Sequence, residues 1–205
     1  PLKWIVLNYD NNNGYLIWSE NSIEKMEFDL KDEQIKENKY GSNYWESSDI
    51  RNYLNSDFKN SFSSKEKEII NKIQLKNVLT YNNIQKKDGG NKPYFWTAIT
   101  SYVDQNYDVD AYYKNSEDEI FLLDTFQLKN YVYDNNINYK KNTRYWLRTP
   151  YYSNTSMVRI VGEDGLVYHK DANVKAGIIP AMYINETLKI KSGNGTKNNP
   201  YIIMP

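Results

Sequence analysis

Alternating apolar and polar positions predict strands at both ends of the chain. Residues 2–8 and 15–19 are rich in β-branched and aromatic side chains and flank an Asn-rich turn that closes on Gly14, a pattern typical of a hairpin. In the last third, short apolar runs are separated by turns, of which Gly162 to Gly165 is the clearest. The strands predicted there are residues 145–148, 156–161, 166–169 and 177–184, and residues 119–123 are predicted to form a further buried strand.

Helical spacing replaces this alternation in the middle of the chain. Apolar residues between positions 45 and 58 fall near one face of a helix that Ser47 or Ser48 is placed to cap. These residues are Trp45, Ile50, Tyr53, Leu54 and Phe58. The first predicted helix therefore follows the first hairpin.

Two further helices are marked by capping boxes, in which a capping side chain and the residue three positions later bond to each other's backbone. Ser63 with Glu66 predicts a helix over residues 65–73. Asp124 with Gln127 predicts another, which follows the buried strand. The helices are therefore expected in the first half and the middle of the chain.

These elements predict an α+β fold, because strands and helices do not alternate as a doubly wound parallel sheet requires. Residues 1–190 are expected to form one domain, and residues 191–205 a C-terminal tail or edge segment. Residues 80–116 lack clear periodicity. A long irregular segment inside a compact domain is usually functional or mobile, so this one is the first candidate for a binding surface.

Amino-acid composition and net charge exclude some classes of binding partner. The chain has 205 residues, of which 40% are hydrophobic and 15% aromatic, so it can bury a sizeable core. The 26 basic and 26 acidic residues cancel, which leaves no electrostatic footprint for nucleic acid or an anionic membrane. No apolar run approaches the roughly 18 residues that span a bilayer, so no membrane insertion is expected. The sequence does not set the oligomeric state.

The absence of cysteine removes several kinds of chemistry. Disulfides, thiolate nucleophiles, iron–sulfur clusters and cysteine zinc sites are excluded, and His169 is the only histidine. We find no recognisable catalytic motif and predict that the chain is not an enzyme, although a pair of carboxylates serving a hydrolase stays an open alternative. Many residues come from AT-rich codons, and the start at Pro1 fits a fragment of a longer protein. We expect an extracellular or cell-surface protein of a Gram-positive bacterium.

Arginine is rare here and therefore informative. Only four of the basic residues are arginines, and Arg51 and Arg148 lie in motifs whose apolar neighbours must face inward. Both are predicted to be structural, largely buried, and bonded to carboxylates or carbonyl groups. The core is predicted to contain Trp4, Trp45 and Trp146.

Several short blocks occur in order along most of the chain. They are Trp4-Ile-Val-Leu7, Trp45-Glu-Ser-Ser-Asp-Ile-Arg51-Asn-Tyr-Leu-Asn55, Ile120-Phe-Leu-Leu123, Tyr145-Trp-Leu-Arg148-Thr-Pro150, Val158 with Gly162 and Gly165, Gly177-Ile-Ile-Pro180-Ala181, and Gly195-Thr-Lys-Asn-Asn-Pro200-Tyr201. Together they resemble the bacterial domain of unknown function 6273, which is common in clostridial surface and secreted proteins. Two positions depart from that pattern: Ile179 stands where the family has arginine, and Tyr145 where it has tryptophan. An arginine-dependent ligand site at position 179 is therefore not implied.

The ending pattern also looks like the C-type-lectin-like and formylglycine-generating superfamily. That resemblance implies a C-type-lectin-like α+β fold with a small twisted antiparallel sheet, two to three helices and long irregular ligand loops. The copper-dependent cysteine chemistry of the formylglycine-generating relatives is not implied, because the chain has no cysteine.

The aromatic loop residues suggest a function. Amphipathic rings are well suited to recognising carbohydrate and protein surfaces. We predict a non-catalytic binding or adhesion module for a glycan or protein ligand, and a structural spacer without a ligand is a further alternative. The candidate ligand-binding residues, for which ordinary packing is the competing interpretation, are Tyr94, Trp96, Tyr107, Tyr112, Tyr113, Tyr151 and Tyr152.

A calcium loop is the one cofactor site that the sequence leaves open. Asp104, Asp108 and Asp110, together with Asn106, place oxygen ligands at alternate positions, as calcium loops do. However, Val109 occupies the place of the glycine at the sharp turn, and Asn115 replaces the bidentate glutamate. No cofactor is expected, and any calcium binding should be weak.

Overall fold

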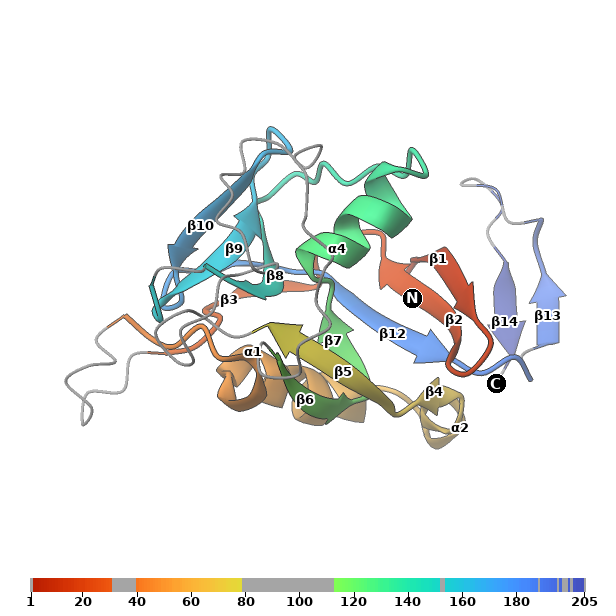
Figure 1. Ribbon diagram of the computed structural model, residues 1–205. Coiled ribbons are helices and arrows are strands. Elements are labelled where there is room, and N and C mark those ends of the chain that lie inside the picture. The colour runs from red at the N-terminus through yellow and green to blue at the C-terminus, as the bar shows by residue number, and fades with distance from the viewer. Residues whose placement is uncertain are drawn as a thin grey trace.

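The structure is a computed structural model, which describes residues 2–30, 40–78, 113–151, 154–187 and most of 189–204. The architecture is α+β, with two antiparallel-rich sheets, short helices against them and two separate hairpins (Figure 1). Among the described residues, no helix is long and apolar enough to cross a membrane.

The first five-stranded sheet is built around β12 (Pro180–Ile184), which is buried along its whole length. One edge of β12 pairs with β2, which in turn pairs with β1, and both pairings are antiparallel. The other edge carries two short strands, β7 and then β4. The bounds of these strands are β1 (Trp4–Asp10), β2 (Gly14–Ser19), β4 (Ile70–Asn71) and β7 (Ile120–Leu122).

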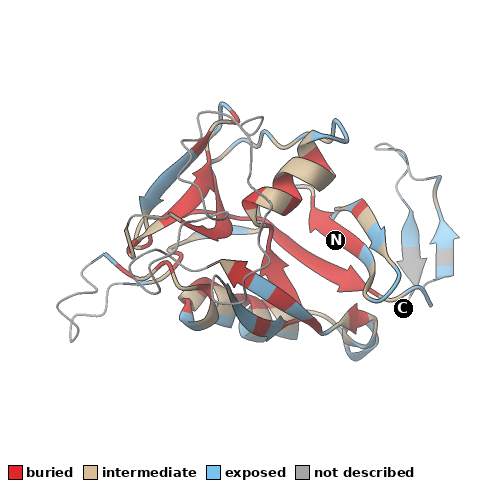
Figure 2. Ribbon diagram, in the orientation of Figure 1, coloured by how far each residue is buried: buried red, intermediate tan, exposed pale blue. Residues whose placement is uncertain are grey.

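The second five-stranded sheet has the order β10-β9-β8-β11-β3. Its strands β8, β9 and β10 form an antiparallel meander, whereas β11 pairs with β8 in parallel, with Gly177 opposite Tyr145. Strand β10 is an edge strand and is largely exposed, as Figure 2 shows. The bounds are β3 (Glu24–Met26), β8 (Tyr145–Pro150), β9 (Met157–Val161), β10 (Val167–Asp171) and β11 (Ala176–Ile178).

The chain passes from one sheet to the other at Ile179. The single strand predicted over residues 177–184 is two strands, β11 and β12, which belong to different sheets and are separated by this residue. Ile179 is 1% exposed. An arginine at this position would have to be buried among apolar residues, which is costly without a partner.

Short helical segments lie beside the sheets. Both predicted capping boxes are confirmed, at Ser63 with Glu66 and at Asp124 with Gln127. The predicted first helix is also present, and Ser48 accepts a hydrogen bond from the backbone of Arg51 as its cap. The segments are η2 (Trp45–Ser47), α1 (Asp49–Tyr53), η3 (Leu54–Phe58), α2 (Ser64–Glu68), α4 (Thr125–Gln127) and η5 (Leu128–Tyr133).

The helix predicted over residues 65–73 is wrong beyond Glu68. Ile70 and Asn71 form β4 instead and pair with the end of β12. The unpaired backbone groups at the edge of β12 offer this segment hydrogen bonds, and the β-branched Ile70 becomes buried there. Tertiary pairing therefore overrides the helical spacing of the isoleucines.

Two further pairs of antiparallel strands lie outside the two large sheets. Strands β5 (Ile73–Val78) and β6 (Tyr113–Asp118) pair with each other, so the irregular segment predicted over residues 80–116 is wrong at its end. The predicted tail contains β13 (Lys189–Ser192) and β14 (Ile202–Met204), which form a hairpin at the margin of the molecule (Figure 1).

The core lies where the two sheets and the helical segments meet. The ring of Phe28 lies 5.9 Å from that of Trp146 and 6.1 Å from that of Trp45. The Trp146 indole also donates to the carbonyl oxygen of Met26 at 3.0 Å. Trp45 and Trp146 are both buried, whereas Trp4 is half-buried and packs against the edge of the core.

Candidate functional site

The turn between β9 and β10 is held by the side chain of Asp164. Its carboxylate accepts the backbone N–H of Leu166 at 2.9 Å and the hydroxyl of Tyr168 at 2.6 Å. Gly165 has a φ of 84°, a backbone conformation that glycine adopts without strain. Two short-range hydrogen bonds and a glycine therefore fix the start of β10.

The ring of Tyr168 lies against the backbone of Gly162. A Cβ atom at Gly162 would be 2.8 Å from the nearest ring carbon of Tyr168, closer than side chains tolerate. The ring is 42% exposed, so one side packs on the turn and the rest faces solvent. The absence of a side chain at Gly162 thus sets where this aromatic surface lies.

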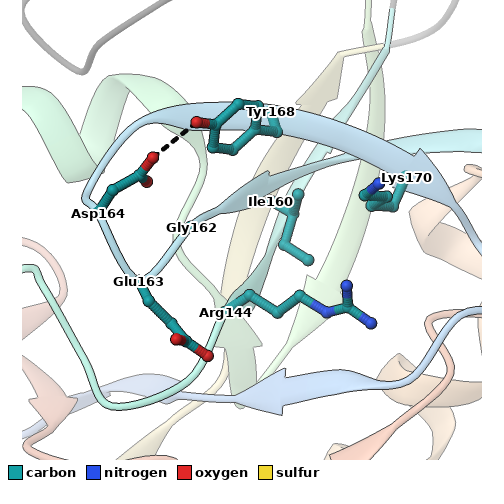
Figure 3. Close-up of a pocket in the computed structure, with 7 residues that line it drawn as sticks. All are labelled: Arg144, Ile160, Gly162, Glu163, Asp164, Tyr168 and Lys170. Atoms are coloured by element: carbon teal, nitrogen blue, oxygen red, sulfur yellow. Dashed lines mark hydrogen bonds between the residues drawn. The ribbon is translucent and has the colours of Figure 1, made fainter.

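The β9–β10 register places apolar and charged groups beside that ring. Ile160 stands directly opposite Tyr168, and Lys170 follows on the same face of β10 because side chains alternate along a strand. Together with the start of β8 and the turn, they surround a pocket of about 450 Å³ (Figure 3). Its lining residues are Arg144, Ile160, Gly162, Glu163, Asp164, Tyr168 and Lys170.

The protonation states of Asp164 and Tyr168 follow from the hydrogen bonds of the turn. The Tyr168 hydroxyl and the N–H of Leu166 hold the pKa of the Asp164 carboxyl below its usual value. The same Asp164 carboxylate raises the pKa of Tyr168. At neutral pH the pair is therefore a phenol donating to a carboxylate, which orients the ring at the pocket wall.

The opposite face of the same strands carries a different cluster. The imidazole of His169 stacks on the ring of Tyr151, with centroids 3.9 Å apart and planes 12° apart. The guanidinium carbon of Arg159, the residue opposite His169 on β9, lies 5.0 Å from the Tyr151 centroid. Burial, followed by the charges of Arg159 and Lys170, lowers the pKa of His169. At neutral pH the imidazole that stacks on the Tyr151 ring is therefore uncharged.

Most of the ligand and metal candidates from the sequence fall outside the described residues. They are Tyr94, Trp96, Tyr107, Tyr112, Tyr152, Asp104, Asp108 and Asp110. The backbone of Tyr113 pairs with Val78 at the start of β6, so this tyrosine lies in a strand and not in an irregular loop. Within the part of the chain that the structure describes, no three histidine or carboxylate side chains are placed to share a metal ion.

The carboxylates that follow the candidate calcium segment have partners within the chain. Glu117 pairs with Lys72 at 2.6 Å, and Glu119 pairs with Lys59. Asp118 lies between them in the sequence. It is buried and accepts a hydrogen bond from helix α1. None of the three carboxylates is therefore left as an uncompensated charge at the end of β6.

Arg51 connects that helix to Asp118. Its Nε donates to the Asp118 carboxylate at 2.6 Å, and its terminal nitrogens donate to the carbonyl oxygens of Glu46 and Glu117. The indole of Trp45 donates to the same carboxylate at 3.2 Å. The Arg51 side chain is 22% exposed, and its contacts join α1 to β6 across 67 residues of sequence.

Arg148 occupies an equivalent position between β8 and α4. One guanidinium nitrogen donates to the carboxylate of Asp124 at 2.8 Å and the other to the side-chain oxygen of Gln127 at 3.2 Å. Its side chain is 4% exposed. The two acceptors are the members of the α4 capping box, so one buried cation ties a helix start to the second sheet.

The pocket residues were not among the candidates drawn from the sequence. The spacing of Gly162, Asp164 and Gly165 predicts a turn, but a tyrosine and a lysine two positions apart on an edge strand look like an ordinary solvated face. Arg144 lies immediately before β8 and 16 residues before Ile160, and only the pairing of β8 with β9 brings them together. The sequence therefore predicted the turn, but it did not indicate that a pocket lies beside it.

The fold and the pocket define an α+β domain whose exposed sheet edge carries an open pocket lined by charges of both signs. The chain belongs to the family described as Domain of unknown function (DUF6273), whose sequence profile matches residues 12–186. The match contains every residue of the pocket, and it ends before the β13–β14 hairpin. No curated protein and no solved structure matches the chain.

Proposed function

We propose that this chain is an extracellular, non-catalytic binding module that recognises a glycan in the pocket beside the β9–β10 turn. One observation carries the proposal: a partly exposed aromatic ring, oriented by Asp164, lies in a pocket between groups that donate and accept hydrogen bonds. Sugars present the matching surfaces, an apolar face of C–H groups and an edge of hydroxyl groups. Figure 3 shows how the ring and Ile160 lie between the charged side chains.

The size of the pocket supports a small ligand unit. Its volume of about 450 Å³ lies within the roughly 300–1,000 Å³ common for small-molecule sites. A flat protein surface would leave such a hollow unfilled. A sugar unit at the end or side of a glycan fits this shape better than a protein interface does.

The acidic groups favour binding over hydrolysis. A glycosidase needs one carboxylic acid with a raised pKa, usually because it is buried away from water. In the pocket, hydrogen bonds lower the pKa of Asp164, and both Asp164 and its neighbour Glu163 are exposed. The Asp164 carboxylate therefore accepts hydrogen bonds well and donates a proton poorly.

The proposal also includes a C-type-lectin-like fold and a place on a bacterial cell surface. The support is the curled antiparallel sheet, the short helices and the absence of cysteine, which suits an exported protein of a Gram-positive bacterium. A module of this kind serves adhesion, because it holds a longer protein to a carbohydrate without changing it.

The test is a glycan array probed with the unmodified protein and two matched tyrosine variants. Tyr168→Ala removes the pocket wall and is expected to abolish binding. Tyr9→Ala is the control, since Tyr9 lies in β1 of the first sheet, is 43% exposed, and also donates from its hydroxyl to a carboxylate, that of Glu186. Equal loss in both variants, full binding by Tyr168→Ala, or release of shortened sugars would contradict the proposal.

A further inference from the structure

The charges of the pocket are divided between its two ends. Figure 3 shows the carboxylates of Glu163 and Asp164 at one end and the side chains of Arg144 and Lys170 at the other, with Ile160 between them. The formal charges cancel over the whole pocket. A ligand therefore meets an oriented field rather than a uniformly basic or acidic surface.

The acidic end is a weak site for a cation, because its carboxylates are exposed to water. Asp164 already accepts the Tyr168 hydroxyl and the Leu166 N–H. Glu163 is exposed, and a single exposed carboxylate attracts an ammonium group only weakly in water. This end is better suited to accept hydroxyl groups.

The basic end has more to offer an anion. Arg144 donates from one terminal nitrogen to the carbonyl oxygen of Lys175 at 3.3 Å, which restrains its position. A guanidinium has five N–H donors, so most remain for a ligand. Within the described residues, neither Arg144 nor Lys170 forms an ion pair with a carboxylate of the chain.

We infer that the glycan bound in this pocket carries a carboxylate, as a hexuronic acid does, and that this carboxylate lies between Arg144 and Lys170. The inference rests on the proposed function and specifies its ligand class. The planar fork of Arg144 matches a carboxylate in two-point hydrogen bonding, and Lys170 adds a second charge. The sugar ring then lies against Tyr168, with its hydroxyl groups toward the acidic end.

Other charged ligands fit less well. A heavily sulfated or phosphorylated chain would place negative charge beside Glu163 and Asp164, where like charges repel. A zwitterionic peptide would need a strong cation site at the acidic end, where both carboxylates are exposed to water and attract a cation only weakly. A sugar with one carboxylate uses both ends without either conflict.

The experiment compares acidic oligosaccharides with uncharged copies of themselves. Calorimetric titrations use trigalacturonate and a hyaluronan tetrasaccharide, each beside its methyl ester, which keeps the rings and removes the charge. At least one acid is expected to bind about tenfold more tightly than its ester, since a charge-assisted hydrogen bond contributes on that scale. The difference is expected to shrink as salt is added.

Variants locate the effect. Arg144→Gln and Lys170→Gln should each remove most of the preference for the acid, because both side chains are exposed and can change without unfolding the protein. Lys65→Gln removes an exposed lysine of α2 instead and should leave the preference intact. Amide signals of Gly162 and Gly165 report whether the ligand occupies the pocket.

The outcomes separate this inference from the proposed function. Equal binding of acids and esters, or a preference that survives both pocket variants, overturns the acidic ligand and leaves a glycan-binding module. Binding of dialanine or of neutral array glycans at Gly162, without binding of either acid, overturns it as well. If no saccharide shifts the pocket signals, the proposed function itself fails.

Discussion

Replacing Arg148 by alanine is expected to lower the free energy of unfolding by about 3 kcal/mol. Removing one partner from a buried ion pair costs about 3–5 kcal/mol, chiefly because the remaining charge is left buried. Here the remaining carboxylate of Asp124 is 19% exposed and still caps the N–H of Gln127 at 2.6 Å, so water and the helix compensate it in part. The lower end of the range therefore applies.

Two further variants divide this cost between charge and packing. Arg148→Met keeps an unbranched side chain near the ring of Phe121, which lies 5.9 Å from the guanidinium carbon, and is expected to cost less than alanine. Asp124→Asn keeps a capping residue but leaves the Arg148 cation buried and unpaired, so it is expected to cost at least as much as alanine. The double variant Arg148→Met with Asp124→Asn should lose less than the sum of its parts.

Urea titration gives these free energies, and a thermal melt gives an independent reading. For a chain of this length, about 3 kcal/mol corresponds to a fall of about 6–12 °C in Tm. A loss below about 1 kcal/mol for Arg148→Ala, or strict additivity in the double variant, would show that the ion pair does not hold α4 to β8. Loss of glycan binding at an unchanged Tm would assign Arg148 to a ligand site instead.

Three other predictions concern pH, the first hairpin and calcium. The pKa of His169 is lower in the folded protein than in the unfolded chain. The contribution of His169 to stability is therefore present above about pH 6.5 and is lost as the pH falls through the folded-state pKa. The single imidazole signal in proton NMR should titrate below about 6.5, and His169→Phe should flatten this part of the curve of stability against pH. Gly14→Ala should destabilise strongly, because Gly14 has a φ of 85° and its new Cβ would collide with the Ile184 carbonyl oxygen; urea titration beside Asn13→Ala measures the difference. Millimolar calcium should leave Tm unchanged relative to chelator, and a rise abolished by Asp108→Ala would reveal a calcium site.

Local signals in the sequence predicted local structure well. The capping boxes at Ser63 and Asp124 involve residues three positions apart, and both formed as expected. The Gly162 to Gly165 turn is equally local. These signals did not predict where each element ends, because Ile70 and Asn71 pair with a strand more than 110 residues later in the chain.

The pocket could not be predicted in the same way. Its lining residues come from β10, from β9, from the turn between them and from the position just before β8, and they meet only through antiparallel register. Tyr168 resembles many other tyrosines in a chain that has 20 of them. The contact that orients it, from its hydroxyl to Asp164, spans four residues but requires a closed turn.

The first sheet determines how the protein would respond to mechanical force. Strands β1 and β12 both pair antiparallel with β2, so they run in the same direction. Trp4 lies opposite Ser19 at one end of β2, and Ile184 lies opposite Tyr15 at the other. Tension applied at Trp4 and Ile184 would act along the strands and load the ladder hydrogen bonds in shear, all at once rather than one after another. Such a domain would resist extension under tension applied in this direction.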